Sequence, residues 1–248
     1  MPTRAVQLVI DAADPSRLAS FWAAALGWEV TADEPDEAVV WPAGFSYPAA
    51  SALPLVFVPV PEPKTVKNRV HLDLATTSAE HQAAEIDRLL GLGAARADIG
   101  QGEVPWEVMA DPEGNEFCVL EPRDVYLDAM PVAAVVVDSA DPPSAARFWA
   151  AATGWAPHDS GPDFASLREP GGTGPYLEFV HVTDAKTVKN RVHLDVAAWP
   201  QRAPASPQDE ARRLRLAGAT LADVGQSDVQ WIVLADPEGN EFCVLTPR

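Results

Sequence analysis

The sequence predicts an α+β fold made of two tandem copies of one domain, and three observations support this. The block KTVKNRVHLDLA, residues 64–75, recurs with one change at residues 186–197. The block ADPEGNEFCVL, residues 110–120, recurs unchanged at residues 235–245. Strand-like and helix-like patterns also follow one another in the same order within each copy. Such identity indicates a tandem duplication, and we predict domains at 1–123 and 131–248 with a linker at 124–130.

The first part of each copy predicts a strand, a helix and about three further strands. Residues 6–10 form a short apolar run typical of a strand. Asp14 and Pro15 predict the start of a helix, because Asp accepts from free backbone N–H groups and Pro fits the first turn. Apolar residues at helical spacing continue to Gly27, where we expect the helix to end. Further strands are predicted at residues 28–30, 38–41 and 55–58. Asp141 starts the same plan in the second copy.

The first repeated block predicts a strand with two different faces. Residues 69–74 alternate between aliphatic and polar side chains. Because successive side chains of a strand point to opposite faces, Arg69, His71 and Asp73 share one face. The aliphatic face then packs against helices, and the polar face lines a concave side or meets water.

The second part of each copy repeats the order of strand, helix and strands. Thr77 with Glu80 is a capping-box signal, and we predict a helix from there to Gly91 or Gly93. Strands are predicted at residues 95–98, 104–109 and 117–120, with turn chemistry between the last two. In the second copy, Ser206-Pro207 opens the equivalent helix and Gly218 closes it. Each copy therefore consists of two βαβββ units.

Composition excludes several functions. The formal net charge of −18 argues against nucleic acid and anionic membrane surfaces as partners. No apolar run approaches the ~20 residues of a membrane span, and no signal peptide is visible. Cys118 and Cys243 occupy equivalent positions, which indicates inheritance by duplication rather than a disulfide. We expect a cytoplasmic protein that binds a small molecule, as a monomer with a pseudo-twofold domain pair or as a homodimer.

Three motifs carry a resemblance to a known family. They are FWAAALGW at residues 21–28, KxxKNRxHLD at 64–73, and ADPEGNEFCVL. With the doubled βαβββ order, they resemble the vicinal oxygen chelate superfamily, which includes glyoxalase I, extradiol dioxygenases and bleomycin-resistance proteins. More narrowly, they resemble its glyoxalase-like domain subgroup. The resemblance implies one cup-shaped mixed sheet of eight strands per domain, with helices on the outer face and the ligand or metal inside the cup.

The resemblance also implies four positions for metal ligands in each cup. In the first domain these positions carry Gln7, Val56, His71 and Cys118; in the second they carry Ala134, Glu178, His193 and Cys243. Neither set is complete, so we assign no metal, and Zn, Ni, Mn or Fe stays possible with Glu178, His193 and His71 as candidates. The second domain suits a metal cation better, since Glu178 offers a negatively charged carboxylate and His193 an imidazole. Two alternatives remain: purely structural histidines and cysteines, or a mixed site across the domain interface.

Two further groups of residues have both a binding and a structural interpretation. Lys64, Lys67 and Arg69, repeated in the second copy, form a basic cluster in an acidic protein. They predict either a clamp for an anion or fixed pairs, in which Arg69 contacts Asp73, Glu113 or Glu116. The equivalent tryptophans of the two copies, Trp106 and Trp231, predict either stacking on a flat ligand at the cup rim or core packing.

The leading hypothesis is a protein that binds a small apolar or aromatic molecule in its cups without the standard metal site. The alternatives are a metal-dependent lyase or isomerase of glyoxalase type, and a degenerate structural domain pair. No catalytic residue is assigned. The candidate ligand-binding residues are Gln7, Arg69, His71, Trp106, Glu116, Cys118, Glu178, Arg191, His193, Trp231, Glu241 and Cys243.

Overall fold

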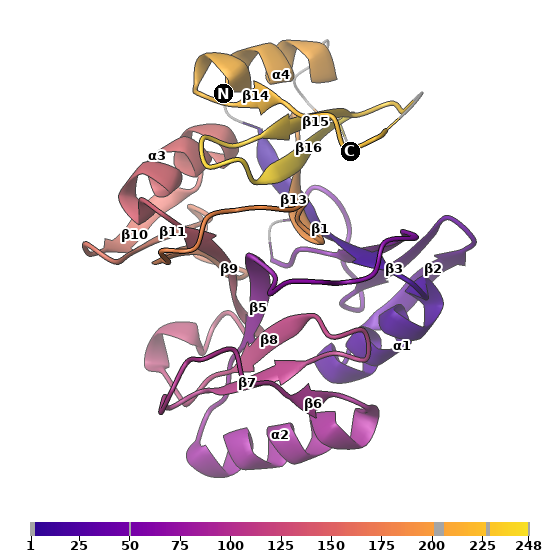
Figure 1. Cartoon of the computed structure of the whole chain (residues 1–248), viewed down its shortest axis with the longest axis vertical. Helices are drawn as coiled ribbons and strands as arrows, with labels where there is room; N and C mark the ends of the chain where they lie inside the picture. Colours follow the sequence, from indigo (N-terminus) through magenta and orange to yellow (C-terminus); the bar gives the residue numbers. More distant parts are fainter. Residues whose placement is uncertain (1–2, 50, 201–205, 227–228, 248) are drawn as a thin grey trace.

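The computed structural model describes residues 3–49, 51–200, 206–226 and 229–247. In this part of the chain four βαβββ modules follow one another, two in each repeat (Figure 1). The Pro-rich stretch at residues 199–207, which we expect to form a loop before the last helix, lies partly outside the described residues. Within the described chain, no helix combines the length and the apolar character needed to cross a membrane.

The four modules have the same order of elements. Module 1 (residues 4–59) comprises β1 (Arg4–Ala12), α1 (Pro15–Leu26), β2 (Glu29–Glu34), β3 (Glu37–Trp41) and β4 (Leu55–Pro59). Module 2 (residues 70–119) comprises β5 (Val70–Leu74), α2 (Ala79–Leu92), β6 (Ala95–Arg96), β7 (Glu107–Ala110) and β8 (Glu116–Val119). Module 3 (residues 132–181) comprises β9 (Val132–Ser139), α3 (Pro142–Thr153), β10 (Ala156–Ser160), β11 (Phe164–Arg168) and β12 (Tyr176–His181). Module 4 (residues 192–245) comprises β13 (Val192–Ala197), α4 (Pro207–Leu216), β14 (Thr220–Leu221), β15 (Ile232–Ala235) and β16 (Glu241–Leu245).

The helix boundaries follow the capping residues. The side chain of Asp14 accepts from the backbone N–H of Arg17, and Gly27 ends α1 in the left-handed conformation with φ 66°. Ser206 caps α4 as predicted. For α2 the prediction was one residue early: Ser78, not Thr77, accepts from the backbone of His81. Both hydroxyls can cap a helix, so the sequence signal does not separate neighbours of this kind.

The strands form two mixed sheets of eight strands, and each sheet combines one module from each repeat. Sheet A joins modules 1 and 4 in the order β14-β15-β16-β13-β1-β4-β3-β2. Sheet B joins modules 2 and 3 in the order β10-β11-β12-β9-β5-β8-β7-β6. The first strands pair antiparallel, β1 with β13 and β5 with β9, in the middle of the molecule (Figure 1). The α+β class and the eight strands per sheet are confirmed, but the two modules of one repeat do not share a sheet as expected.

Long-range contacts explain this pairing across the repeats. The first strands of the four modules have similar apolar patterns, so the pattern alone does not choose a partner. Arg69, which precedes β5, donates to the carbonyl oxygens of Asp138 at 2.9 Å and Asp184 at 2.8 Å, both in the second repeat. Arg191 donates in the same way to Asp11 and Glu62 of the first repeat. These four bonds fix each loop to the other repeat, and no sequence signal shows them.

The main core lies between the sheets and their helices and holds the two modules of one repeat together. Trp22 of α1 is 2% exposed, and its indole N–H donates to Asp111 Oδ2 at 3.1 Å. Its ring packs edge-on against Phe117 of β8, with 5.1 Å between centroids. Trp149 and Asp236 repeat the bond in the second copy. The FW and ADPEGNEF motifs are therefore structural partners, and the helical spacing that predicts core packing for Trp22 and Trp149 agrees with the structure.

Each sheet has a second face, opposite the main core, that carries a smaller apolar cluster. On sheet A this cluster includes Val6 and Cys243, with Tyr47 packed against it. On sheet B it includes Cys118 and Tyr126, with Trp106 packed against it. We call these two faces cup A and cup B.

Candidate functional site

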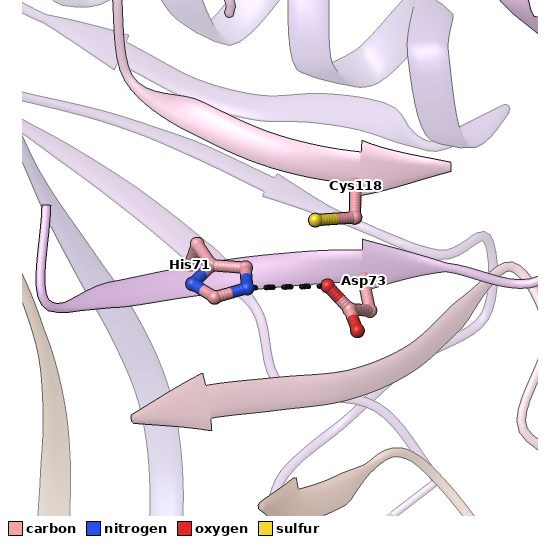
Figure 2. A group of neighbouring side chains, drawn as sticks. All are labelled: His71, Asp73 and Cys118. Atoms are coloured by element: carbon pink, nitrogen blue, oxygen red, sulfur yellow. Dashed lines mark ion pairs between the residues drawn. The ribbon is translucent and has the colours of Figure 1, made fainter. Parts of the chain in front are cut away.

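Three potential metal ligands meet in cup B. His71 and Asp73 lie two residues apart on β5, so both point into the cup, and Cys118 lies on the neighbouring strand β8 (Figure 2). Parallel pairing places Asp73 opposite Cys118. One ligand atom from each of the three residues lies within 4.8 Å of the other two.

Glu178 from the second repeat joins this group. Strand pairing aligns His71 with Val136 of β9, and Val136 with Glu178 of β12. Residues aligned across neighbouring strands share a face of the sheet, so Glu178 points into cup B. The charges of Asp73 and His71 both act on the ionisation of Glu178, which agrees with this placement. Cup B therefore combines a carboxylate from module 3 with the His71, Asp73 and Cys118 set from module 2.

The linker positions the Glu178 carboxylate. Tyr126 of the linker helix η1 (Asp124–Tyr126) is 6% exposed, and its hydroxyl donates to Glu178 Oε1 at 2.9 Å. Burial raises the pKa of Glu178 to about 7, the Tyr126 hydrogen bond lowers it, and the negative charge of Asp73 raises it. Arg168 pairs with Asp128 at 2.8 Å and thereby ties the linker to β11. A carboxyl group with this pKa exchanges protons near neutral pH.

Cup A repeats the three ligands but has different neighbours. His193, Asp195 and Cys243 also offer atoms within 4.8 Å of one another, and Cys243 Sγ lies 3.5 Å from His193 Nε2. Gln7 of β1 donates to Asp195 Oδ2 at 2.9 Å and accepts from the Tyr47 hydroxyl at 3.2 Å. The position equivalent to Glu178 carries buried Val56, which pairs with Val9. Cup A therefore gains a neutral amide from β1 and an aliphatic side chain from β4, whereas cup B gains a second carboxylate from β12.

The two thiols are held in their protonated form by their surroundings. Both cysteines are buried and free, in different sheets, which confirms the absence of a disulfide between them. Burial, and then the neighbouring Asp73 carboxylate, raises the pKa of Cys118 far above its ordinary value. Burial and Asp195 raise the pKa of Cys243 in the same way. Neither thiol is therefore an activated nucleophile.

The sheet topology corrects the predicted partnership of Glu178 and His193. Glu178 lies on β12 of sheet B, whereas His193 lies on β13 of sheet A. The expectation that the second domain offers both ligands in one cup is therefore wrong. Gln7 and His71, expected together in the first cup, are likewise separated. The mixed arrangement across the repeats, considered as an alternative, is the one observed.

The two tryptophans proposed for the rim differ from each other. Trp106 packs against the apolar cluster of cup B, and the guanidinium of Arg123 lies 5.9 Å from its ring centroid. Trp231, its equivalent, is 42% exposed. A shared sequence position thus gives a partly buried ring in one copy and an exposed ring in the other.

Four other candidate residues bind protein groups. Glu116 accepts from Lys64 Nζ at 2.6 Å and from the backbone N–H of Asn68 at 3.0 Å. Glu241 makes the equivalent pair with Lys186 at 2.7 Å. Arg69 and Arg191 donate to backbone carbonyl oxygens of the other repeat. Arg69 therefore binds carbonyl oxygens and not one of the carboxylates expected for it. In the second copy, Arg191 Nη2 lies 3.8 Å from Glu113 Oε2.

Sequence reasoning did not select four residues that complete the cups. Asp73 and Asp195 could have been found, because the His-x-Asp spacing on a strand places both side chains on one face. Tyr47 and Tyr126 carried no comparable signal. Tyr126 lies in a linker, and its contact with Glu178 depends on the pairing of modules from different repeats.

The residues of cup B fit a divalent metal such as zinc. Asp73 Oδ1 lies 3.3 Å from His71 Nε2, yet it is buried and makes no hydrogen bond with any described residue. A buried carboxylate oxygen without a donor is costly, and a cation would satisfy it. One imidazole nitrogen, one carboxylate oxygen and one sulfur suit zinc better than magnesium or calcium. Asp195 Oδ1 is also buried without a hydrogen bond to the described part of the chain, so cup A shares this feature.

Comparisons with known proteins agree with the fold. The family model described as "Glyoxalase-like domain" matches residues 7–120 and 134–245. The crystal structure of glyoxalase I from Zea mays superposes with a TM-score of 0.61 at 13% identity, covering 98% of this chain and 92% of that chain. A putative dioxygenase from Bacillus subtilis superposes with a TM-score of 0.57 at 14% identity, covering 99% and 86%. A search of the curated proteins finds no significant match.

Proposed function

The chain belongs to the glyoxalase-like domain family, and we propose that it is a metal-dependent lyase or isomerase of glyoxalase type whose active site is cup B. One observation supports this most. Glu178 of the second repeat and the His71, Asp73 and Cys118 set of the first repeat point into the same cup. The substrate would be a small molecule with two neighbouring oxygen atoms, as the superfamily name implies.

In this proposal each residue of cup B has a separate role. His71, Asp73 and Cys118 would hold a zinc-like ion, and that ion would polarise a carbonyl oxygen of the substrate. Glu178 would accept a proton from the substrate and return it, because its pKa of about 7 suits proton transfer near neutral pH. Tyr126 would orient Glu178 through the 2.9 Å hydrogen bond. Trp106 would border the apolar part of the substrate.

A metal-free binding protein is the second candidate, and the thiols favour it. In a cup without a metal ion, each cysteine stays protonated, because burial and a neighbouring carboxylate raise the pKa of its thiol. Cup B would then bind a small apolar or aromatic molecule against Trp106 and Tyr126. In either case, the two reduced cysteines and the acidic charge are consistent with a cytoplasmic protein without nucleic-acid or membrane partners.

Elemental analysis of the purified protein separates the two candidates. The enzyme hypothesis predicts bound zinc, nickel, manganese or iron that a chelator removes together with activity toward a hemithioacetal or similar substrate. His71→Ala should lower metal affinity by at least about a hundredfold, and His193→Ala, its equivalent in cup A, should do so less. Protein that binds a small molecule equally well before and after chelation, and contains no metal, would support the binding hypothesis.

A further inference from the structure

A pocket of about 550 Å³ lies between the two copies of the KTVKNRV loop. Its lining consists largely of equivalent residues from the two repeats, such as Lys67 with Lys189 and Val66 with Val188. The pocket therefore lies on the pseudo-twofold axis, and its symmetry makes it a single site shared by both repeats. It is separate from the cups, because His71, Glu178 and Cys118 are not part of its lining.

The pocket is positively charged in a strongly acidic protein. Among the described residues, five lysines and arginines line it: Lys67, Arg69, Lys186, Lys189 and Arg191. Four acidic residues also line it: Asp11, Glu62, Asp138 and Asp184. The formal charge of the lining is therefore one positive unit, whereas the whole chain carries −18. A small anion in this pocket therefore meets less repulsion than the net charge of the whole chain implies.

Two lysines hold fixed positions and still reach into the pocket. Lys67 Nζ bonds Asp138 Oδ2 at 2.6 Å and the carbonyl oxygen of Asn68 at 3.2 Å. Lys189 Nζ pairs with Asp11 in the same manner. An ammonium group has three N–H donors, so these contacts leave Lys67 a donor for a ligand. The side chains of Lys67 and Lys189 are 33% and 38% exposed.

The rest of the lining includes two arginines held in fixed positions and two exposed valines. The guanidinium groups of Arg69 and Arg191 are fixed to carbonyl oxygens of the opposite repeat at 2.7–2.9 Å. Val66 and Val188 are 45% and 43% exposed, which offers an apolar contact from each repeat. Glu62 and Asp184 are exposed acids in the lining, and they would weaken the binding of an anion without preventing it, because solvent screens exposed charges in part.

We infer that this pocket binds one small dianion per chain, with an anionic group at each end and a short apolar body between them. The two lysines lie on either side of the axis, so each would bind one end of the ligand. Val66 and Val188 would contact the apolar body. A linear dicarboxylate has this chemistry.

Calorimetric titration of the whole chain with succinate, adipate and suberate tests the inference, with butyrate as the single-ended control. We expect one dicarboxylate per chain, and an affinity for the best chain length at least about tenfold above that for butyrate, because the second end binds at high effective concentration. Equal affinities for dicarboxylates and butyrate, two ligands per chain, or no binding at millimolar concentration would overturn it.

Matched variants test the symmetry of the site. Lys67→Gln and Lys189→Gln should weaken binding of the best dicarboxylate by equal factors of about tenfold, because each removes one charge-assisted hydrogen bond. Lys67→Arg should retain binding. Arg212→Gln, which removes a remote exposed charge on α4, should have no effect. Unequal losses from the two lysine variants would contradict a site on the axis.

A second pair of variants leaves the lysines and their ion pairs intact. Glu62→Gln and Asp184→Asn remove the acids that would repel the ligand, so each should tighten binding. A loss of affinity or no change in either variant would contradict the proposal that a dianion binds beside these two acids.

Discussion

Cup A and cup B carry the same His, Asp and Cys residues, but they differ in what surrounds them. Cup A adds Gln7, a neutral amide that donates to Asp195. Cup B adds Glu178, a carboxylate that accepts from Tyr126. The second carboxylate gives cup B one more negative charge for a cation and one group that can transfer a proton near neutral pH.

The difference shows how a duplication can produce two unequal sites. Each sheet joins the first module of one repeat to the second module of the other. A substitution in the first module of one repeat therefore changes the cup that contains the histidine of the other repeat. The linker adds a second asymmetry, since it occurs once in the chain and supplies Tyr126 to cup B. Four experiments would strengthen or break this comparison, and their expected effects decrease from the first to the last.

Placing a carboxylate in cup A should be strongly destabilising. Val56 is 4% exposed and occupies the position equivalent to Glu178. Val56→Glu should cost about 3 kcal/mol at pH 8, because a charge is buried there without a Tyr126 equivalent to stabilise it. The cost should be smaller at pH 5, where the carboxyl group takes up a proton. Urea unfolding at both pH values measures it, with Val56→Gln as the uncharged control. Equal costs for both variants at pH 8 would mean that cup A accepts a charge as readily as cup B.

Glu178 should make the protein less stable as the pH rises. Its folded pKa of about 7 lies above the ordinary value of 4.5, so the native state keeps a proton that the unfolded chain has lost. The free energy of unfolding should therefore fall between about pH 4.5 and 7, by an amount on the order of 3 kcal/mol. Glu178→Gln should lack this part of the pH dependence. Parallel pH profiles for the wild type and Glu178→Gln would be inconsistent with a buried carboxyl group of raised pKa.

Removing the Tyr126 hydroxyl should affect cup B alone. Tyr126→Phe should cost about 1 kcal/mol and raise the pKa of Glu178 further, because the lost hydrogen bond lowers that pKa. Tyr47→Phe, which removes the cup A hydroxyl that donates to Gln7, should leave the pKa of Glu178 unchanged. NMR titration of labelled glutamate side chains measures both. Equal pKa changes in the two variants would show that the cups are not independent.

The cysteines should differ only when a metal is present. Without metal, Cys118 and Cys243 should both react slowly with a thiol reagent in the native protein, because burial raises the pKa of each thiol. Two free thiols should appear on denaturation. One equivalent of zinc should protect Cys118 more than Cys243, and mass spectrometry of the labelled peptides measures this. Stronger protection of Cys243 would reverse the assignment of the cups.

The local structure could be predicted from the sequence because it depends on neighbouring residues. Asp14 and Gly27 bound the first helix by capping chemistry, and the alternation around His71 places its side chain opposite the core. The doubled βαβββ order and the eight strands per sheet followed from these local signals and the resemblance.

The contents of each cup could not be predicted, because they depend on which first strands pair. Glu178 and His193 are close in sequence, and no local signal separates them into different sheets. The bonds that fix the pairing run from Arg69 and Arg191 to backbone carbonyl oxygens, which every residue has. Tyr126 could be recognised only once that pairing was known.

The location of a bound metal tests the central claim most directly. Crystals grown with one equivalent of zinc per chain can be measured at the zinc absorption edge, and the anomalous signal gives the position of the ion. The account predicts one dominant peak in cup B, between His71, Asp73 and Cys118. A dominant peak between His193, Asp195 and Cys243, or peaks of equal height in both cups, would contradict the claim that Glu178 makes cup B the functional site.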